Sequence, residues 1–346
     1  MTETIFIAAL TLILVALFRW AFRALPGENW QILAAVPLHK HASGRWAGLN
    51  LTWYGFFSAS AYVLAAAVYL VLAASVGVPL AAAGAVLVAV LGLCAPAAKL
   101  LARLIEGKSF TFTVGGASFV GILAAPFLVR WVEALSGWPL PVFPLMAAIA
   151  VAYAFGEGVG RLACVSFGCC YGRPLSDFGP SARGRLERWS FTFTGKTKKI
   201  AYESGLDGQK VLPVQAFSAV VNSAAGLAGA VLFLASQFAA AFLMTVVLTQ
   251  AWRFFSEFLR ADFRGHGRIS AYQKMNVAAV LYAAALAALV PASAPAAVDL
   301  AAGLWILWSP AMILSLQGLW IVFFLYTGRS SVTGSTMDFF VHRDRI

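Results

Sequence analysis

Long, unbroken apolar segments alternate with short polar ones along the chain. Because the apolar residues are continuous and do not occupy every second position, the pattern predicts helices and not the strands of a membrane barrel. Nine segments are long enough, or nearly so, to cross about 30 Å of hydrocarbon. They cover residues 4–22, 50–74, 78–97, 116–135, 142–163, 212–235, 238–259, 275–297 and 300–326. No small-residue cleavage site follows the first segment, so we expect a membrane anchor and not a signal peptide.

The composition indicates the same class of protein. Hydrophobic residues make up 61% of the 346 residues, and charged residues make up only 11%. An ordinary soluble domain carries about 25% charged residues, so too few charges remain here to cover a soluble surface. A soluble fold, a disordered chain and a small disulfide-stapled protein are therefore excluded. The expected fold class is an all-α polytopic membrane protein.

The spacing of the segments divides the chain into five regions. We predict an N-terminal anchor helix and connection (1–48), core helices (49–160), an extramembrane head (161–211), further core helices (212–297) and an extra C-terminal helix and tail (298–346). Within the head, the stretch FTFTGKTKKIAYESGLDGQKVL is typical of a short β-hairpin.

The basic residues are distributed unevenly across the predicted membrane. Lys and Arg number 25 against 14 Asp and Glu, which gives a net charge of +11. With nine alternating spans, Arg130 is the only basic residue that we place on the face opposite the head. The positive-inside rule would make the basic face cytoplasmic. The alternative is that this face binds an anionic ligand.

The segment FGEGVGRLACVSFGCCYGRP, residues 155–174, combines small and charged residues. Small residues at multiples of four allow close helix contact, and they are Gly156, Gly160, Gly168 and Gly172. Glu157 and Arg161 lie four residues apart on one helical face, so they are expected to pair. Helix packing with a structural ion pair is the simpler interpretation, but charges at the end of a span are more often functional.

A second charged segment, WRFFSEFLRADFRG, covers residues 252–265. Arg253, Glu257 and Arg260 lie at i, i+4 and i+7 and are expected to share one helical face. Two arginines around one carboxylate leave a positive pocket, and a guanidinium fork suits a phosphate because it contacts two oxygens at once. For Arg260, an interfacial side chain that reaches toward water is an equal alternative.

The cysteines give no metal-binding signature. Neither a second CxxC motif nor a suitably spaced histidine accompanies them, so we expect no metal site and no cofactor. Arg161 and Arg173 are close enough in sequence to lower a thiol pKa, which leaves a catalytic thiol open. Small-residue packing is the alternative that we favour for Cys94, Cys164, Cys169 and Cys170.

Five motifs in this order, from about Leu49 to Val290, resemble the bacterial phosphatidylglycerol–prolipoprotein diacylglyceryl transferase family. The matching positions are Tyr54 in WYG; Gly115, Gly116, Ser118, Phe119 and Gly121 in GGASFVGI; Gly160, Arg161, Gly168 and Gly172 in GRLACVSFGCCYG; Pro213 and Gln215 in LPVQAFS; and Arg253, Phe254, Glu257, Phe258 and Arg260 in RFFSEFLR. Gln273 in ISAYQKM stands for a late glycine–glutamine pair of the family.

The resemblance implies a seven-helix core, so the first and last spans look like additions. It also implies a multi-pass enzyme of the bacterial inner membrane whose site faces the periplasm, in conflict with the charge rule, and we follow the resemblance. Such an enzyme moves the diacylglyceryl group of phosphatidylglycerol to the lipobox cysteine of a prolipoprotein, forming a thioether and releasing glycerol-1-phosphate. The expected partners are therefore an anionic phospholipid, a lipobox segment and the membrane, with no nucleic acid.

The resemblance assigns roles to individual residues. Arg161 and Arg253 would hold the lipid phosphate, with Glu257 orienting them and Arg260 supporting them. The other expected substrate-binding residues are Tyr54, Gly115, Gly121, Gly160, Gly172, Arg173, Gln215 and Gln273.

Several residues depart from the family pattern. Val120 stands where the family has a proposed catalytic histidine, and Cys164 and Cys169 stand where it has an asparagine and a glutamate. Leu212 and Thr249 stand where the family has a second histidine and a tyrosine. Glu157, which the usual motif lacks, is a candidate catalytic residue as a substitute base. The departures also leave open a related transferase with another acceptor, or a non-catalytic protein that binds or transports anionic lipid.

Overall fold

The computed structural model describes residues 2–40, 42–43, 46–107, 113–261, 269–291, 297–330, 336–337 and 344, and the fold is mainly helical. Eight helices in the described residues are long and apolar enough to cross a membrane, which confirms an all-α polytopic membrane protein. They are α1 (Thr2–Ala24), α2 (Trp53–Ser75), α3 (Leu80–Glu106), α4 (Val114–Ser136), α5 (Val142–Phe167), α8 (Val214–Leu234), α9 (Phe238–Ser256) and α12 (Pro310–Thr327).

Two of the nine predicted spans differ from the structure. The segment at 275–297 corresponds to α10 (Ala271–Leu289), which has 19 residues and packs against α9 and α4. Its first two turns carry Gln273, Lys274 and Asn276, which lower its mean hydropathy, so it is not among the eight.

The prediction of one helix over 300–326 is wrong. The segment forms α11 (Leu300–Trp305) and a 3-10 turn, η5 (Ile306–Trp308), before α12 begins. The Ser309 hydroxyl caps α12 by accepting from the Met312 amide, 3.2 Å away. Pro310 follows at the first helical position, where its missing N–H costs nothing but where it cannot continue a preceding helix.

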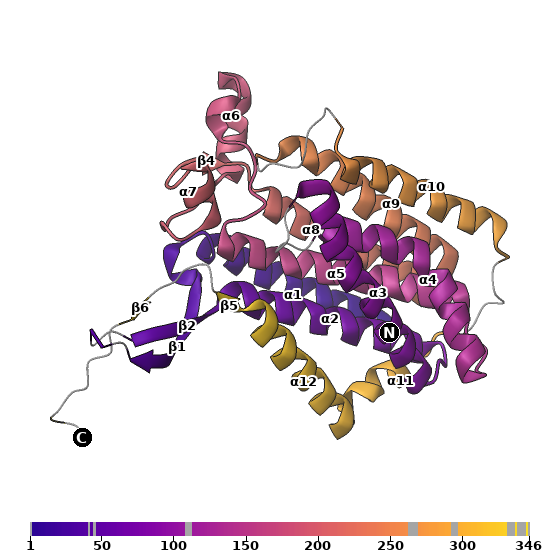
Figure 1. Cartoon of the computed structure of the whole chain (residues 1–346). Helices are drawn as coiled ribbons and strands as arrows, with labels where there is room; N and C mark the ends of the chain where they lie inside the picture. The colour runs from indigo at the N-terminus through magenta and orange to yellow at the C-terminus, as the bar shows by residue number, and fades with distance from the viewer. Residues whose placement is uncertain are drawn as a thin grey trace.

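Helix α5 lies at the centre of the bundle, where it packs against α2, α8 and α9 (Figure 1). It is also the most buried of the eight candidate spans. Glycines allow this close packing: a Cβ atom on Gly156 would lie 2.9 Å from the Cβ of Ala65 in α2. On the side facing α8, a Cβ on Gly158 would lie 2.2 Å from the Ser223 hydroxyl. The neighbouring helices therefore hold α5 closely on two sides.

The predicted glycine repeat serves two purposes. Gly156 and Gly160 face α2, and a Cβ on Gly160 would lie 3.5 Å from that of Ala61. Gly168 instead follows the last residue of α5 with a φ of 70°, a left-handed conformation that glycine adopts without strain. Since α5 continues to Phe167, Arg161 belongs to this helix and not to the predicted head.

The head lies at one end of the helices, and a separate hairpin of β1 (Ile32–Lys40) and β2 (Trp46–Thr52) lies at the same end (Figure 1). The hairpin predicted inside the head is confirmed in a reduced form: β3 (Phe191–Thr192) pairs with β4 (Lys210–Val211). The residues between them form α7 (Lys199–Ser204), and before them lie η2 (Leu175–Asp177), α6 (Pro180–Leu186) and η3 (Glu187–Trp189).

A longer hairpin was not predicted. After a 3-10 turn, η1 (Glu28–Trp30), strand β1 (Ile32–Lys40) pairs antiparallel with β2 (Trp46–Thr52), which in turn pairs with β5 (Arg329–Ser330) and β6 (Thr336–Met337). The Thr52 amide and hydroxyl both donate to the Gly328 carbonyl at 3.0 Å. This sheet therefore ties the end of α12 to the start of α2.

A buried lysine fastens the head to the bundle. Lys198 is fully buried, and its Nζ donates to the carbonyls of Leu25, just after α1, and Ser166, in the last turn of α5, at 3.2 and 2.6 Å. The ammonium thus satisfies carbonyls that the ends of two helices leave free. Burial lowers the pKa of Lys198 from its ordinary value of 10.5 to about 8.

This pKa predicts a pH dependence of stability. Between pH 8 and about 10.5, the unfolded chain binds a proton at Lys198 that the folded chain has released. Rising pH in this window therefore favours the folded state. Thermal unfolding in detergent should show Lys198→Met gaining less stability from pH 8 to pH 10 than the unaltered protein. Equal gains in the two proteins would contradict the account.

Candidate active site

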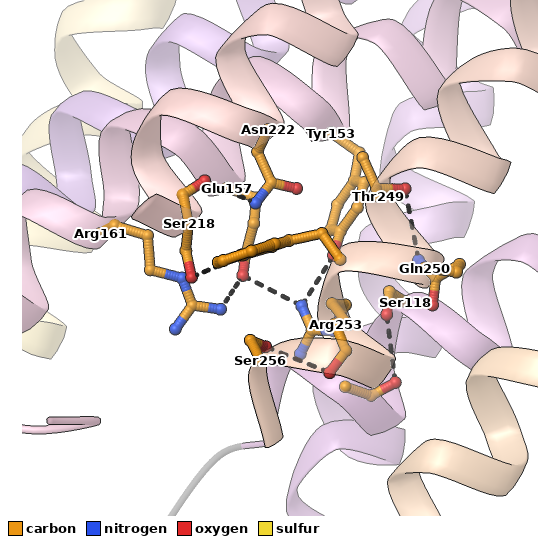
Figure 2. A network of polar contacts seen from close by, with 12 residues as sticks. Ser118, Tyr153, Glu157, Arg161, Ser218, Asn222, Thr249, Gln250, Arg253 and Ser256 are labelled. Atoms are coloured by element: carbon orange, nitrogen blue, oxygen red, sulfur yellow. Dashed lines mark hydrogen bonds and ion pairs between the residues drawn. The ribbon is translucent and has the colours of Figure 1, made fainter. Parts of the chain in front are cut away.

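A buried carboxylate lies between two arginines inside the bundle (Figure 2). Glu157 Oε1, on α5, accepts hydrogen bonds from Arg161 Nη2 on the same helix and from Arg253 Nη1 on α9, the latter at 3.0 Å. The exposed fractions of the side chains are 7% for Glu157 and 12% for each arginine. We call these three residues the arginine clamp.

Tyr153 extends the clamp by one helical turn. Its hydroxyl accepts a hydrogen bond from Arg253 Nη1 at 2.9 Å (Figure 2). Tyr153, Glu157 and Arg161 are spaced four residues apart along α5, so they lie on one face of the helix. Tyr153 is not among the residues predicted from the sequence, although this four-residue spacing is the signal that would have identified it.

The clamp carries a net positive charge. Two guanidiniums, which remain protonated in proteins, surround one carboxylate, and Arg161 Nε is buried with no hydrogen-bond partner among the described residues. A buried charge in excess of its partners is costly unless a ligand of opposite sign joins it. The arrangement therefore favours binding of an anion.

Gly115 makes room for one guanidinium. A Cβ on this residue of α4 would lie 3.2 Å from Arg253 Nη2 and 3.2 Å from Tyr272 Cδ1. Gly121 lies further along α4, where the nearest atom to such a Cβ is Cys94 Sγ at 3.1 Å. Of these two predicted residues, only Gly115 contacts the clamp.

The prediction that Arg253, Glu257 and Arg260 share one helical face is wrong. Helix α9 ends at Ser256, and a 3-10 turn, η4 (Glu257–Leu259), follows it. Arg260 then adopts extended backbone, and its Nη1 lies 3.9 Å from Glu257 Oε1. The carboxylate that joins two arginines is therefore Glu157, and Glu257 lies in a second pair with Arg260.

The backbone after the cysteines lies between Arg260, which follows the end of α9, and Leu212, which precedes α8. Gly172 forms an antiparallel bridge with Arg260, and its amide donates to the Leu212 carbonyl at 3.2 Å. A Cβ on Gly172 would lie 2.5 Å from that carbonyl oxygen, so a larger residue would separate the two segments. The Arg173 guanidinium turns into the head, 3.5 Å from Asp177 Oδ2 and 5.0 Å from the centre of the Phe178 ring.

Two predicted glutamines hold backbone close to the site. Gln215 Nε2 donates to the Cys169 carbonyl at 2.7 Å. Gln273 Nε2 donates to the Phe254 carbonyl at 3.0 Å, and its Oε1 accepts from the Ser270 amide at 2.9 Å as part of a capping box. Both side chains are almost fully buried, so they position neighbouring residues.

Tyr54 lies at the start of α2. Its ring packs edge-on against Phe167, the last residue of α5, with 5.6 Å between the ring centres. Tyr54 therefore lies beside the turn that follows α5.

Three cysteines meet at this turn. The sulfurs of Cys164, Cys169 and Cys170 all lie within 4.8 Å of one another, an arrangement not predicted from the sequence. The pKa of the Cys170 thiol lies well below its usual value, and the largest cause is that the other two thiols donate hydrogen bonds to its sulfur. The guanidiniums of Arg260 and Arg161 act in the same direction.

Comparison with known proteins identifies the family. The family model for prolipoprotein diacylglyceryl transferase matches residues 44–289. The chain belongs to the prolipoprotein diacylglyceryl transferase family. A search of curated proteins found no match. The family assignment supports a membrane transferase that acts in lipoprotein biosynthesis.

The family match covers the predicted core of the chain. It begins after α1 and ends with α10, so it contains seven long helices, namely α2, α3, α4, α5, α8, α9 and α10. Helices α1, α11 and α12 lie outside the match, as expected for additions to the core.

The hydrogen bond from Arg253 to Tyr153 predicts a loss of transferase activity in Tyr153→Phe. The arginine keeps Glu157 but loses one fixed acceptor, so kcat/KM should fall about ten-fold, or about 1.4 kcal/mol. Tyr282→Phe is the matched control, because the Tyr282 hydroxyl donates to the Leu123 carbonyl in another part of the bundle. An unchanged kcat/KM in Tyr153→Phe would show that the tyrosine does not position Arg253.

Proposed function

We propose that the protein transfers the diacylglyceryl group of phosphatidylglycerol to the lipobox cysteine of prolipoproteins. The reaction forms a thioether and releases glycerol-1-phosphate. The observation that carries the proposal is the arginine clamp, in which Arg161 and Arg253 are both held by Glu157 within the bundle.

The chemistry of the reaction fits the charge of the clamp. Breaking the carbon–oxygen bond of a phosphate ester places negative charge on the departing phosphate. Cations that are already fixed at that position stabilise the transition state without reorganisation, and such groups are worth about 10²–10³ in rate each. A guanidinium also matches two phosphate oxygens at once, which fixes the orientation of the lipid.

Glu157 is better suited to orient the arginines than to act as a base. Its Oε1 already accepts from both guanidiniums, and two adjacent positive charges favour its ionised, weakly basic form. We therefore assign lipid-phosphate binding to Arg161 and Arg253, orientation to Glu157, and support of the adjoining backbone to Glu257 and Arg260.

We also propose that the protein resides in the bacterial inner membrane with this site toward the periplasm, where a lipobox cysteine is presented. The basic head lies at the same end of the helices as the clamp. Demand for an anionic ligand would then override the usual charge bias, which long translocated loops obey poorly. A reporter fused near Lys198 should give a periplasmic signal, and a reporter near Val76 a cytoplasmic one.

A related transferase with another acceptor is the second candidate. The observation that favours it is that Val120, Cys164 and Cys169 occupy positions where the family pattern has a histidine, an asparagine and a glutamate. The clamp serves both candidates, because both use an anionic phospholipid.

Incubation of the purified full-length protein with labelled phosphatidylglycerol and a lipobox peptide separates these functions. Lipidated peptide with released glycerol-1-phosphate is the expected result. Release without peptide modification would indicate another acceptor, and neither product would indicate a non-catalytic lipid-binding protein.

Variants of the clamp sharpen the same assay. Arg253→Lys should lower the rate about 10²–10³-fold, because an ammonium lacks the planar fork. Glu157→Gln should weaken lipid binding and lower the rate together, because an amide oxygen still accepts from the arginines but no longer balances their charge. Complete loss in Glu157→Gln with normal lipid binding would instead favour the base role. Arg130→Lys is the control, because Arg130 is exposed and pairs with Glu133 at the other end of the bundle.

A further inference from the structure

The three thiols at the end of α5 form a group that the arginine clamp does not use. Cys164 lies in the last turn of the helix, and Cys169 and Cys170 follow it across Gly168. The positive φ angles of Gly168, 70°, and of Cys170, 55°, fold the chain back toward the helix end. All three cysteines are free thiols and are partly buried.

The spacing of the sulfurs fits a single thiophilic metal ion. Zinc–sulfur bonds of about 2.3 Å at tetrahedral angles place the sulfurs about 3.8 Å apart. The three sulfurs lie within 4.8 Å of one another, so small rotations of the side chains would bring them to that spacing. Thiolate ligands select soft and borderline cations over magnesium or calcium.

The coordination would be incomplete. No histidine, aspartate or glutamate of the described residues joins the three cysteines as a fourth ligand. Structural zinc sites have four protein ligands, whereas catalytic sites have three and keep one position open. Three thiolates and one divalent cation leave a single negative charge, and cationic residues lie nearby. Arg161 is one turn before Cys164, and Arg260 is bridged to Gly172.

We propose that Cys164, Cys169 and Cys170 bind one thiophilic divalent cation of the zinc type, and that its open position receives the thiolate of the acceptor cysteine. This inference rests on the proposed function, which requires an acceptor thiol. The cation would activate the acceptor thiol in a chain that has Val120 at the position of the family's proposed catalytic histidine.

The position of the cysteines suits such a step. Glu157, Arg161 and Cys164 are spaced at i, i+4 and i+7 along α5, so the clamp and the first sulfur share one helical face. A lipid whose phosphate is bound by the arginines would therefore present its glyceryl carbon near the metal-bound sulfur.

The transfer step balances in charge and atoms. The acceptor thiol releases its proton to water when its sulfur binds the cation, since a coordinating thiol is deprotonated. The sulfur forms a bond to the glyceryl carbon, and the carbon–oxygen bond breaks with its electron pair passing to the phosphate oxygen. Glycerol phosphate departs, and the neutral thioether leaves the cation, whose oxidation state is unchanged.

Metal analysis of the purified full-length protein tests the site without reference to activity. About one zinc per chain is expected, and Co²⁺ in its place should give the absorption bands of cobalt–thiolate coordination. Cys164→Ser, Cys169→Ser and Cys170→Ser should each weaken Zn²⁺ binding at least ten-fold. Cys94→Ser is the matched control, since this cysteine lies in α3 and outside the group, and it should bind as the unaltered protein does.

The absence of zinc together with no cobalt–thiolate bands in the unaltered protein would overturn the proposal, whatever the serine variants do. Equal metal binding by all four variants would overturn it too. Removal of the metal should abolish peptide lipidation while phosphatidylglycerol still binds, and full activity of the metal-free protein would overturn the acceptor step alone. If no preparation lipidates the peptide, the proposed function and the acceptor step fail together, whereas the metal count still decides the site.

Discussion

The contact between Glu157 and the two arginines is the interaction on which the rest of the site depends. Charges inside a membrane bundle are costly unless each has a close partner, and this carboxylate partners both Arg161 and Arg253. Without it, two positive side chains would repel each other in a nearly dry environment. With it, they are fixed side by side and keep one surplus positive charge. That surplus is what makes an anionic lipid a suitable ligand and a developing phosphate charge a favourable one.

Helix α5 connects this charge balance to the rest of the molecule. The glycines on its faces let α2 and α8 approach closely, so the helix that carries Glu157 and Arg161 is packed tightly on two sides. Gly115 on α4 has no side chain and so leaves room for the Arg253 guanidinium beside that helix. At its C-terminal end, α5 is fastened by the buried ammonium of Lys198, and the chain then turns through Gly168 to Cys169 and Cys170. Lipid phosphate and acceptor thiol would thus be placed along a single helix.

Much of this was predictable from the sequence, and the exceptions have physical causes. Continuous apolar segments predict the helices, and a spacing of four residues predicts the pair formed by Glu157 and Arg161. The same helical reasoning fails for Arg260, because α9 ends before it and pairing with the Gly172 backbone decides its place. The thiol group depends on two left-handed residues after α5, and the hairpin of β1 and β2 depends on pairing between segments. Neither feature follows from a repeating pattern of hydrophobic and polar residues within one segment.

Native mass spectrometry of the purified protein can measure directly whether Arg161 and Arg253 bind the phosphate of an anionic lipid. The measurement compares retention of phosphatidylglycerol with that of phosphatidylethanolamine of the same acyl chains. The unaltered protein should retain phosphatidylglycerol preferentially, and a protein carrying Arg161→Gln and Arg253→Gln should lose that preference while remaining folded. A preference that survives both substitutions would contradict the account.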